Sequence, residues 1–435
     1  MRTPALCIGL LLSCFVSCAA TDSPFPNVVL IISDDQAWSD YSFMGHPHIK
    51  TPNLDRLASE SVTFLRGYTP VPLCRPALSS IVTGLYPHQH GVAGNDPSLP
   101  DRGVNPMAAR GNEKYARYYD TILSNFQSQP NLVRDLVSRG YQALQTGKWW
   151  EGDPKETCGF TQAMTVGVGK GARHGDAGLA IGREGLDPVY HFIDQAKGKP
   201  FLVWYAPMLP HTPHNPPEDL LSKYLKVAPG EPTARYWANV EWFDRTCGQL
   251  LNYLESAGLK ENTIVIYTTD NGWIQDAKAK NQFAPRSKRT AYEGGIRTPI
   301  MVRWPARLKP RLEEKYLATN LDIWPTLAGL LGTPQPPGLP GINLADTRAL
   351  SKRSRIFGEQ YAHDIADVAK PAASLEHRWM IDGYWKLIVP QDPASAASLY
   401  DLRSDPWENH DVGPNRSSQV KKMRKMLDAW WDPAK

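Results

Sequence analysis

"NVVLIISDD", residues 27–35, is an apolar, β-branched run that stops abruptly at two aspartates. Near-continuous apolar runs of this length are typical of strands that are buried on both faces of a parallel sheet. Three further runs stop in the same way, at residues 141–150 (YQALQTGKWW), 200–211 (PFLVWYAPMLPH) and 263–272 (TIVIYTTDNG).

Helical patterns lie between these runs, at residues 51–62, 128–140, 185–196 and 234–258. The alternation of strand and helix predicts an α/β fold. We therefore expect a large, mostly parallel sheet that is flanked by helices.

The chain divides into a main domain and a smaller unit. The proline- and glycine-rich residues 333–341 (TPQPPGLPG) end a predicted main domain of residues 21–335. Residues 336–435 are predicted to form a C-terminal α+β subdomain, in which Asp382-Gly383 joins two strands of a small antiparallel sheet and residues 417–431 form a terminal helix. Two stretches, 95–130 and 165–178, are predicted to be long surface loops that border a site.

The first twenty residues differ in character from the rest. Arg2 precedes the apolar residues 5–20 (ALCIGLLLSCFVSCAA), which are too short to span a bilayer and end in small side chains. This pattern predicts a secretory leader over residues 1–20 and an exported protein. The sequence LLSC also resembles a bacterial lipoprotein signal, in which Cys14 would carry a lipid anchor. The expected location is therefore periplasmic, secreted or lipid-anchored at the cell surface.

Three cysteines remain after the leader, namely Cys74, Cys158 and Cys247. An odd number in an exported chain leaves one unpaired. Cys158 and Cys247 could form a disulfide, although their spacing cannot show it, and Cys74 is the natural odd one out.

The charge of the chain is nearly balanced, with 48 lysines and arginines against 44 aspartates and glutamates. The resulting net charge of +4 is small for 435 residues and is not gathered in a block. Nucleic acid is therefore not an expected partner.

Oxygen-bearing side chains follow two of the predicted strands. Asp34 and Asp35 follow the first, and Asp270 and Asn271 follow the last. Ligands of α/β sheets bind outside the carboxyl ends of the strands, so these side chains can converge. Carboxylate and amide oxygens suit Ca2+ or Mg2+ and not zinc. The sequence therefore predicts a divalent-metal site.

Basic side chains point to an anion beside that metal. Lys148 ends one strand, His211 follows another in PHTP, and Lys288 lies in RSKRTAYEGGIRTP. Aimed at the same edge of the sheet, the three would form a pocket for a tetrahedral anion of modest charge.

Cys74 stands at the entrance of a predicted helix in residues 71–84 (VPLCRPALSSIVTG), with Pro76 as the first helical residue and Gly84 as the end. A group there meets the positive end of the helix dipole. A single cysteine is more often inert packing, but this one accompanies the metal and anion candidates and is therefore a candidate nucleophile.

Several long motifs, taken together, resemble the type I sulfatases of the alkaline phosphatase superfamily, which depend on formylglycine. The resemblance covers essentially the whole mature chain. It rests on residues 27–38 (NVVLIISDDQAW), 48–64 (HIKTPNLDRLASESVTF), 72–92 (PLCRPALSSIVTGLYPHQHGV), 146–150 (TGKWW), 210–213 (PHTP), 267–272 (YTTDNG), 288–299 (KRTAYEGGIRTP) and 399–412 (LYDLRSDPWENHDV).

The resemblance implies a sulfuric ester hydrolase that acts on an exported, carbohydrate substrate. It implies that a maturation enzyme oxidises Cys74 to formylglycine, whose hydrate is the nucleophile. One Ca2+ ion is then expected on Asp34, Asp35, Asp270 and Asn271, with the modified residue 74 completing its shell. Lys148, His211 and Lys288 are expected to hold the sulfate oxygens, and His211 or Lys288 to protonate the leaving alcohol.

Two positions depart from the family pattern. Leu78 stands where the motif Cys-x-Pro-x-Arg has arginine, and Arg75, at the helix start, is expected to point elsewhere. Trp150 stands where the family has the histidine that acts as base, and an indole cannot accept a proton. Candidate replacements are His174, also a candidate substrate contact, His88 and His90.

All four metal candidates are present, so we expect an active but divergent sulfatase. Two other functions are compatible with the sequence. One is hydrolysis of phosphate esters, phosphodiesters or phosphonates within the same superfamily. The other is a catalytically silent binder of sulfated glycans that keeps the pocket without a nucleophile.

Overall fold

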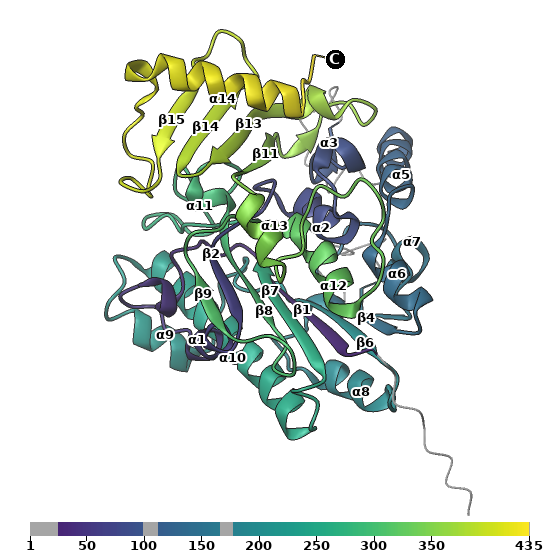
Figure 1. Ribbon diagram of the computed structural model, residues 1–435. Helices are drawn as coiled ribbons and strands as arrows, with labels where there is room; N and C mark the ends of the chain where they lie inside the picture. The colour runs from purple at the N-terminus through teal and green to yellow at the C-terminus, as the bar shows by residue number, and fades with distance from the viewer. Residues whose placement is uncertain (1–24, 99–111, 166–176, 435) are drawn as a thin grey trace, which may run out of the picture.

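A nine-stranded sheet forms the centre of the computed structural model, which describes residues 25–98, 112–165 and 177–434 (Figure 1). The strand order is β10-β2-β8-β7-β1-β6-β4-β5, and β9 pairs with β2. β8 is antiparallel to β2 and β7, and the other pairs are parallel, so the predicted α/β architecture is confirmed. The strands are β1 (Asn27–Ser33), β2 (Val62–Tyr68), β4 (Gln142–Gly147), β5 (Gln162–Ala163), β6 (Phe201–Ala206), β7 (Thr263–Thr269), β8 (Arg297–Arg303), β9 (Arg311–Glu313) and β10 (Ala318–Thr319).

Both faces of this sheet are covered, because successive side chains of a strand point to opposite faces. In β1, Val28 and Leu30 pack into the apolar cluster beneath α2, α6 and α12, whereas Val29 and Ile31 pack against α1, α8 and α10. The helices are α1 (Pro52–Ser59), α2 (Cys74–Thr83), α3 (Pro87–His90), α5 (Glu113–Gln127), α6 (Leu132–Ser138), α7 (Pro154–Cys158), α8 (Asp187–Gln195), α9 (Glu218–Tyr224), α10 (Glu231–Ser256), α11 (Glu293–Ile296), α12 (Ile323–Leu331), α13 (Thr347–Lys352) and α14 (Ser417–Trp430).

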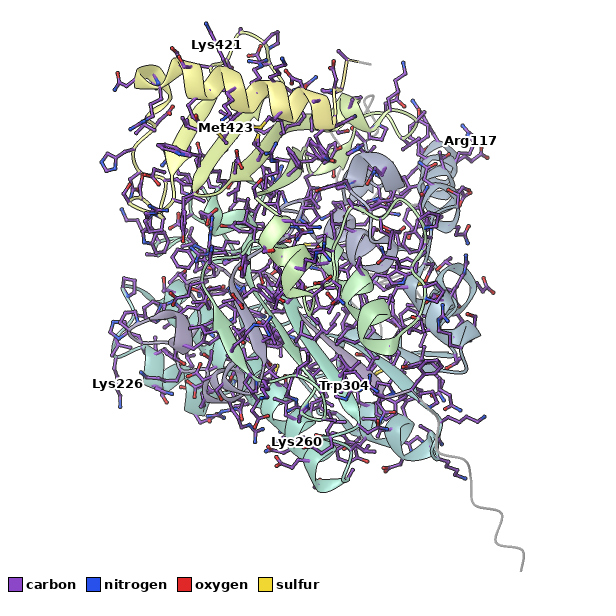
Figure 2. The ribbon with its side chains drawn as sticks, in the orientation of Figure 1. Arg117, Lys226, Lys260, Trp304, Lys421 and Met423 are labelled. Carbon is purple, nitrogen blue, oxygen red and sulfur yellow. The ribbon has the colours of Figure 1, made fainter. Side chains whose placement is uncertain are left out.

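A second, antiparallel sheet lies near one end of the first, with the order β11-β13-β14-β15 (Figure 1). α14 covers it, with Met423 buried toward the strands and Lys421 directed outward (Figure 2). The hairpin predicted at Asp382-Gly383 joins β13 to β14, which confirms a small C-terminal antiparallel sheet. The domain division at residues 335 and 336 stays a prediction. The strands outside the large sheet are β3 (Asp96–Pro97), β11 (Arg355–Tyr361), β12 (Asp364–Ile365), β13 (Leu375–Asp382), β14 (Trp385–Pro390) and β15 (Ser398–Asp401).

The prediction of a loop throughout residues 95–130 was wrong. Residues Glu113–Gln127 form α5, whose Tyr115, Ile122 and Phe126 are buried. The Asn112 side chain accepts hydrogen bonds from the backbone N–H groups of Lys114 and Tyr115 and so caps the helix. The segment was predicted to be a loop because its overall hydrophobicity is low. Its apolar residues form one narrow stripe along the helix.

The disulfide that the sequence left open does not form. Cys158 and Cys247 are free and buried, and they belong to apolar clusters on opposite faces of the large sheet. In the described ranges, no helix combines the length and hydropathy needed to cross a bilayer. The leader residues 1–20, including Cys14, lie outside the described residues.

The buried His90 predicts an acid-sensitive stability. Burial lowers the pKa of this imidazole from 6.5 to about 3. Between these two pH values the imidazole binds a proton in the unfolded chain but not in the folded chain. The contribution of His90 to the unfolding free energy is therefore full above pH 6.5 and decreases as the pH falls toward 3. The slope of the unfolding free energy with pH measures the number of protons that are bound on unfolding. In urea titrations between about pH 7 and pH 4, His90→Asn should reduce this slope by the equivalent of about one proton.

The exposed His410→Asn is the matched control, since its side chain is 84% accessible. Equal pH slopes for the wild-type and His90→Asn proteins would contradict the prediction.

Candidate active site

Acidic side chains from two strands meet at the carboxyl edge of the large sheet. Asp34 and Asp35 follow β1, and Asp270 and Asn271 follow the adjacent parallel strand β7. The Asn271 Nδ2 donates to Asp35 Oδ1 at 2.6 Å, and the Asp35 backbone N–H donates to Asp270 Oδ1 at 3.1 Å. Residues more than 230 positions apart are therefore in direct contact.

The oxygens of this cluster fit a divalent cation. Asp34 Oδ2, Asp270 Oδ2 and Asn271 Oδ1 are buried and accept no hydrogen bond from the described residues. Oxygens of Asp34 and Asp35 and the sulfur of Cys74 lie within 4.8 Å of one another. Burial, opposed by Lys148 and reinforced by the neighbouring carboxylates, raises the pKa values of Asp34 and Asp270. A buried carboxylate cluster with unsatisfied oxygens is a site that a hard cation such as Ca2+ would stabilise.

The three predicted basic groups face the same cluster. Lys148 Nζ lies 2.6 Å from Asp34 Oδ1, and Lys288 Nζ lies 2.6 Å from Asp35 Oδ1. His211 Nε2 lies 3.4 Å from Asp35 Oδ2. Burial disfavours the charged lysines, but the adjacent carboxylates outweigh it and raise the pKa values of both, so the ammonium forms persist at neutral pH. The geometry thus brings the predicted anion-binding groups beside the predicted metal ligands.

Two tryptophans form walls beside these lysines. Lys148 Nζ lies 4.9 Å from the ring centre of Trp150, and Lys288 Nζ lies 5.4 Å from that of Trp273. Cation–π attraction favours a charged ammonium at such positions. The ring of Trp150 therefore stabilises the charged form of Lys148. It stands at the position where the family pattern has the histidine base.

The loop that carries His211 is anchored by residues that sequence reasoning missed. Arg183 donates to the carbonyl oxygens of Met208 at 2.7 Å and of His211 at 3.1 Å. From α10, Asn239 donates to the carbonyl oxygen of Pro210 at 3.2 Å. The His211 Nδ1 is 2.7 Å from the Thr212 carbonyl oxygen, and this contact directs Nε2 toward Asp35. No local motif marks Arg183 or Asn239, because their partners are backbone atoms of a distant loop.

His214 is a second imidazole near the cluster. Its ring packs against Tyr236 and Trp273, with centroid distances of 5.3 and 5.9 Å. Its Nε2 is buried and has no hydrogen-bond partner in the part of the chain that the structure describes. Burial lowers its pKa to about 4, against the attraction of Asp35, so the ring is neutral. The repeated histidine in PHTPH was the only sequence signal for it.

Cys74 is the first residue of α2, two residues earlier than predicted. Its side chain is only 1% exposed, and burial raises its pKa to about 12 in spite of Lys148 and Lys288. A thiol with this pKa is almost wholly protonated at neutral pH and is a poor nucleophile.

The two departures from the family pattern lie beside each other. Leu78 and Trp150 line the same small cavity, of about 10 Å³. As expected, Arg75 is turned to another partner: its Nε and Nη2 donate to Glu151 at 2.7 and 2.8 Å. Because the two side chains border the same small space, we interpret the two changes as one repacked unit.

Of the candidate replacement bases, His88 and His90 have partners outside the cluster. His90 is buried with its Nε2 3.0 Å from Ser80 Oγ, and so packs locally. His88 pairs with Glu359 and stacks on Trp431 at 4.3 Å. His174 lies outside the described residues.

The buried carboxylate cluster and the lysines beside it are an arrangement suited to a divalent cation and a tetrahedral oxyanion ester. Residues 26–333 match the family model for sulfatases, and residues 283–431 match the model described as N-sulphoglucosamine sulphohydrolase, C-terminal. The chain belongs to the sulfatase family of the alkaline phosphatase superfamily, the enzymes that hydrolyse sulfate esters.

Similar proteins span nearly the whole chain. Human arylsulfatase A is 26% identical, over 89% of this chain and 83% of its own length. An N-acetylgalactosamine-6-O-sulfatase of Bacteroides thetaiotaomicron is 24% identical, over 94% and 93%. A structure solved with its substrate D-glucosamine-2-N,6-O-disulfate superimposes with a TM-score of 0.72 at 19% identity, and the match covers 94% of this chain and 98% of that one.

A double-mutant cycle tests whether Leu78 and Trp150 act as one unit. Leu78→Arg alone should cost ~3 kcal/mol of unfolding free energy or more, because it buries an unpaired charge in filled space. Trp150→His alone should cost ~3 kcal/mol, because it leaves a cavity. The double variant should lose ~1 kcal/mol or more less unfolding free energy than the sum of the two single losses, because the guanidinium can occupy the volume that the indole leaves.

Urea unfolding of the four proteins measures the coupling. Leu78→Arg combined with Leu427→Ala, which is buried in α14, is the matched control and should be additive. Additivity of the Leu78 and Trp150 changes would contradict the interpretation.

Proposed function

We propose that this sulfatase removes sulfate from a carbohydrate with a formylglycine at position 74 and one calcium ion. The ion would be held by Asp34, Asp35, Asp270 and Asn271, with residue 74 completing the shell. The observation that carries the proposal is the set of buried, unsatisfied oxygens on three of these side chains next to Cys74.

When present, the calcium ion and the formylglycine hydrate would supply Lewis acidity and an ionisable hydroxyl group. The unmodified thiol cannot fill that second role well, since burial raises its pKa to about 12. The burial of position 74 thus adds to the motif as support for a modified side chain there.

The basic residues would bind and orient the substrate. Lys148 and Lys288 remain charged and would each hold a sulfate oxygen, while the aromatic rings of Trp150 and Trp273 exclude water beside them. A sulfate monoester carries a single negative charge, which two lysines and one metal ion can balance.

Protonation of the leaving alcohol would fall to His211 or Lys288. His211 is the better placed for proton transfer, because the Thr212 carbonyl fixes its Nδ1 and leaves Nε2 directed at the cluster. The neutral His214 would contact the substrate from the same side, through its unsatisfied Nε2. We retain His174 as a proposed substrate contact.

Sulfated carbohydrate is the proposed substrate class because named relatives act on sulfated sugars. A formylglycine-generating enzyme is the proposed maturation partner. Export, with cleavage of residues 1–20 or a lipid on Cys14, is likewise a proposal that rests on the leader pattern.

The fold alone does not distinguish sulfate from phosphate, phosphodiester or phosphonate esters. The described cluster argues against a two-zinc phosphatase, since such enzymes need a further set of histidine and aspartate ligands that is not found beside it. A silent glycan binder stays the second alternative. Initial rates on aryl sulfate, phosphate and phosphodiester esters separate these functions.

Mass spectrometry of protein from the native host tests the modification. The peptide that contains position 74 should have the mass of formylglycine, and Cys74→Ala should lower the turnover of 4-nitrophenyl sulfate by at least ~10³-fold, as expected for loss of a nucleophile. Cys158→Ala, which removes an equally buried thiol on the α6 side, is the matched control. A free thiol at position 74 in active protein would refute the proposal.

Chelation tests the metal. Removal of divalent ions with EGTA should abolish turnover and lower the melting temperature, because it leaves buried carboxylates without a cation. Calcium should restore both, and zinc should not. In the Asp34→Asn variant the calcium-dependent rise of the melting temperature should shrink, and an unchanged rise would contradict the assignment of this ligand.

A further inference from the structure

The outward side of α14 gathers positive charge. Lys421, Lys422, Arg424 and Lys425 are all exposed, and Figure 2 shows Lys421 directed away from the small sheet. The helix has one acidic side chain, Asp428, so its formal charge is four minus one, or +3. The whole chain has a net charge of only +4. The nearly balanced total therefore conceals one basic surface, formed by these four cations, which we call the α14 face.

Neighbouring acids do not neutralise the α14 face. In the described part of the chain, none of its four cations has an ion-pair partner. The carboxylate of Asp428 is engaged elsewhere, because Arg378 of β13 donates to it at 2.8 Å. On α10, by contrast, Arg235 pairs with Glu231 one turn away at 2.8 Å. The positive charge of the α14 face therefore remains open to a partner.

This arrangement does not stabilise the helix. Side chains three and four positions apart are neighbours on a helix surface, and like charges at these spacings repel each other. Lys421 has Arg424 and Lys425 at exactly these spacings. The four cations also stand in the middle of a helix that ends at Trp430, so the negative end of the helix dipole does not account for them. Concentrated charge that costs the fold stability is typical of a surface that binds an anionic partner.

The apolar residues of α14 face the other way, which limits the kind of partner. Met423 and Leu427 are buried against the small sheet. The large apolar side chains that are exposed in the described ranges lie on other elements, namely Leu225, Val227, Leu312 and Trp407. A helix that binds a membrane surface presents apolar side chains beside its basic ones. The α14 face has no large apolar side chain to insert, so its partner is one held by charge.

The α14 face lies apart from the metal cluster. Successive residues of β13 point to opposite sides of the small sheet, with Ile381 packed toward Tyr68 of the large sheet and Met380 packed toward Met423 of α14. α14 thus covers the side of the small sheet that is turned away from the large sheet (Figure 1). A ligand on this face would be held by the enzyme without touching the reacting groups.

A sulfated polymer has the charge that this surface requires. The four cations span five consecutive positions, or about 6 Å along the helix axis, so their charges add at one place. Sulfate groups stay ionised at neutral pH and recur along a polysaccharide, so several of them can contact one compact basic surface. The proposed substrate class is thus opposite in charge to the α14 face.

We propose that the α14 face binds a segment of the sulfated polysaccharide on which the active site acts. The inference rests on the proposed sulfatase function, which identifies the anionic partner, and extends it from the reacting sulfate to the polymer that carries it. Binding at this face would keep the polymer close to the enzyme between successive reactions. It would not orient the sulfate that is being cleaved.

A charge-reversal variant tests the face. Lys421→Glu, Lys422→Glu and Lys425→Glu are combined in one protein, which leaves the buried side of α14 unchanged. The matched control combines Lys197→Glu, Lys199→Glu and Lys309→Glu, which alter the net charge equally at exposed positions of other elements. A third protein with arginine at positions 421, 422 and 425 keeps the charge and serves as the rescue variant. Melting temperatures verify that all four proteins are folded.

Binding is measured with heparin, chondroitin sulfate and carrageenan polymers, and with dextran sulfate against uncharged dextran. The wild-type protein should bind at least one sulfated polymer and not dextran. Charge reversal on α14 should weaken that binding by at least ~10-fold, because three attractive contacts become repulsive, whereas the control should change it by less than ~2-fold. The arginine variant should bind like the wild-type protein. Equal losses in the α14 variant and the control, or no loss in the α14 variant, would overturn the inference.

Kinetics separate this face from the active site. For the polymer that is desulfated, charge reversal on α14 should lower kcat/KM by ~3- to 10-fold, mainly through KM, and the effect should shrink in high salt because exposed charges are screened. The rate on 4-nitrophenyl sulfate should not change. A fall in the rate on 4-nitrophenyl sulfate that equals the fall on the polymer would overturn the inference, because it would show an effect on the reacting groups.

The binding measurement needs no turnover, so the two proposals fail separately. If the wild-type protein hydrolyses no sulfate ester, the proposed function fails, and polymer binding still decides the role of the α14 face. Absence of binding to every sulfated polymer would overturn the inference. Tighter binding to phosphatidylglycerol vesicles or to duplex DNA than to the sulfated polymers would overturn it as well, in favour of that other partner.

Discussion

The burial of like charges at the ends of two adjacent parallel strands is the constraint on which the site depends. Carboxylates after β1 and β7 are held within contact of each other by the register of the sheet, in the interior of the protein. Each bare carboxylate in such a place is costly, and the cost is offset by opposite charge. Lys148 and Lys288 supply part of that opposite charge from other elements of the fold. A cation bound to the oxygens without hydrogen-bond partners would supply the rest. The ammonium groups are thereby kept charged, and this charge is what an anionic substrate needs.

The position of most site residues could be predicted because the chemistry follows strand ends. An apolar run that stops at polar side chains marks the carboxyl edge of a buried parallel strand, and such edges converge whatever the order of the chain. Asp34, Asp270 and Lys148 could therefore be placed together from the pattern of the sequence alone. Their roles as ligands remain proposals that came from the family resemblance.

Other features had no local signal. Arg183 acts on backbone carbonyls of a distant loop, and the spacing of residues cannot reveal such a contact. Residues Glu113–Gln127 look polar because one narrow stripe alone is buried. The adjacency of Leu78 and Trp150 is also invisible in a linear pattern, since a helix residue and a residue after β4 meet only in the folded core. Two changes that look like separate losses in the sequence thus lie along one small cavity.

The C-terminal sheet is joined to the main domain by buried charge as well as by apolar packing. Lys386, from β14, lies 3.0 Å from Glu293 of α11 and 2.7 Å from Glu408, and the latter accepts from the Glu293 backbone N–H. Glu293 follows the segment that carries Lys288, and Glu408 is the neighbour of Trp407. The small sheet is consequently not a module that evolution could exchange freely: a foreign replacement without a lysine at this place would leave the buried Glu293 with Arg297 and Tyr68 as its remaining partners.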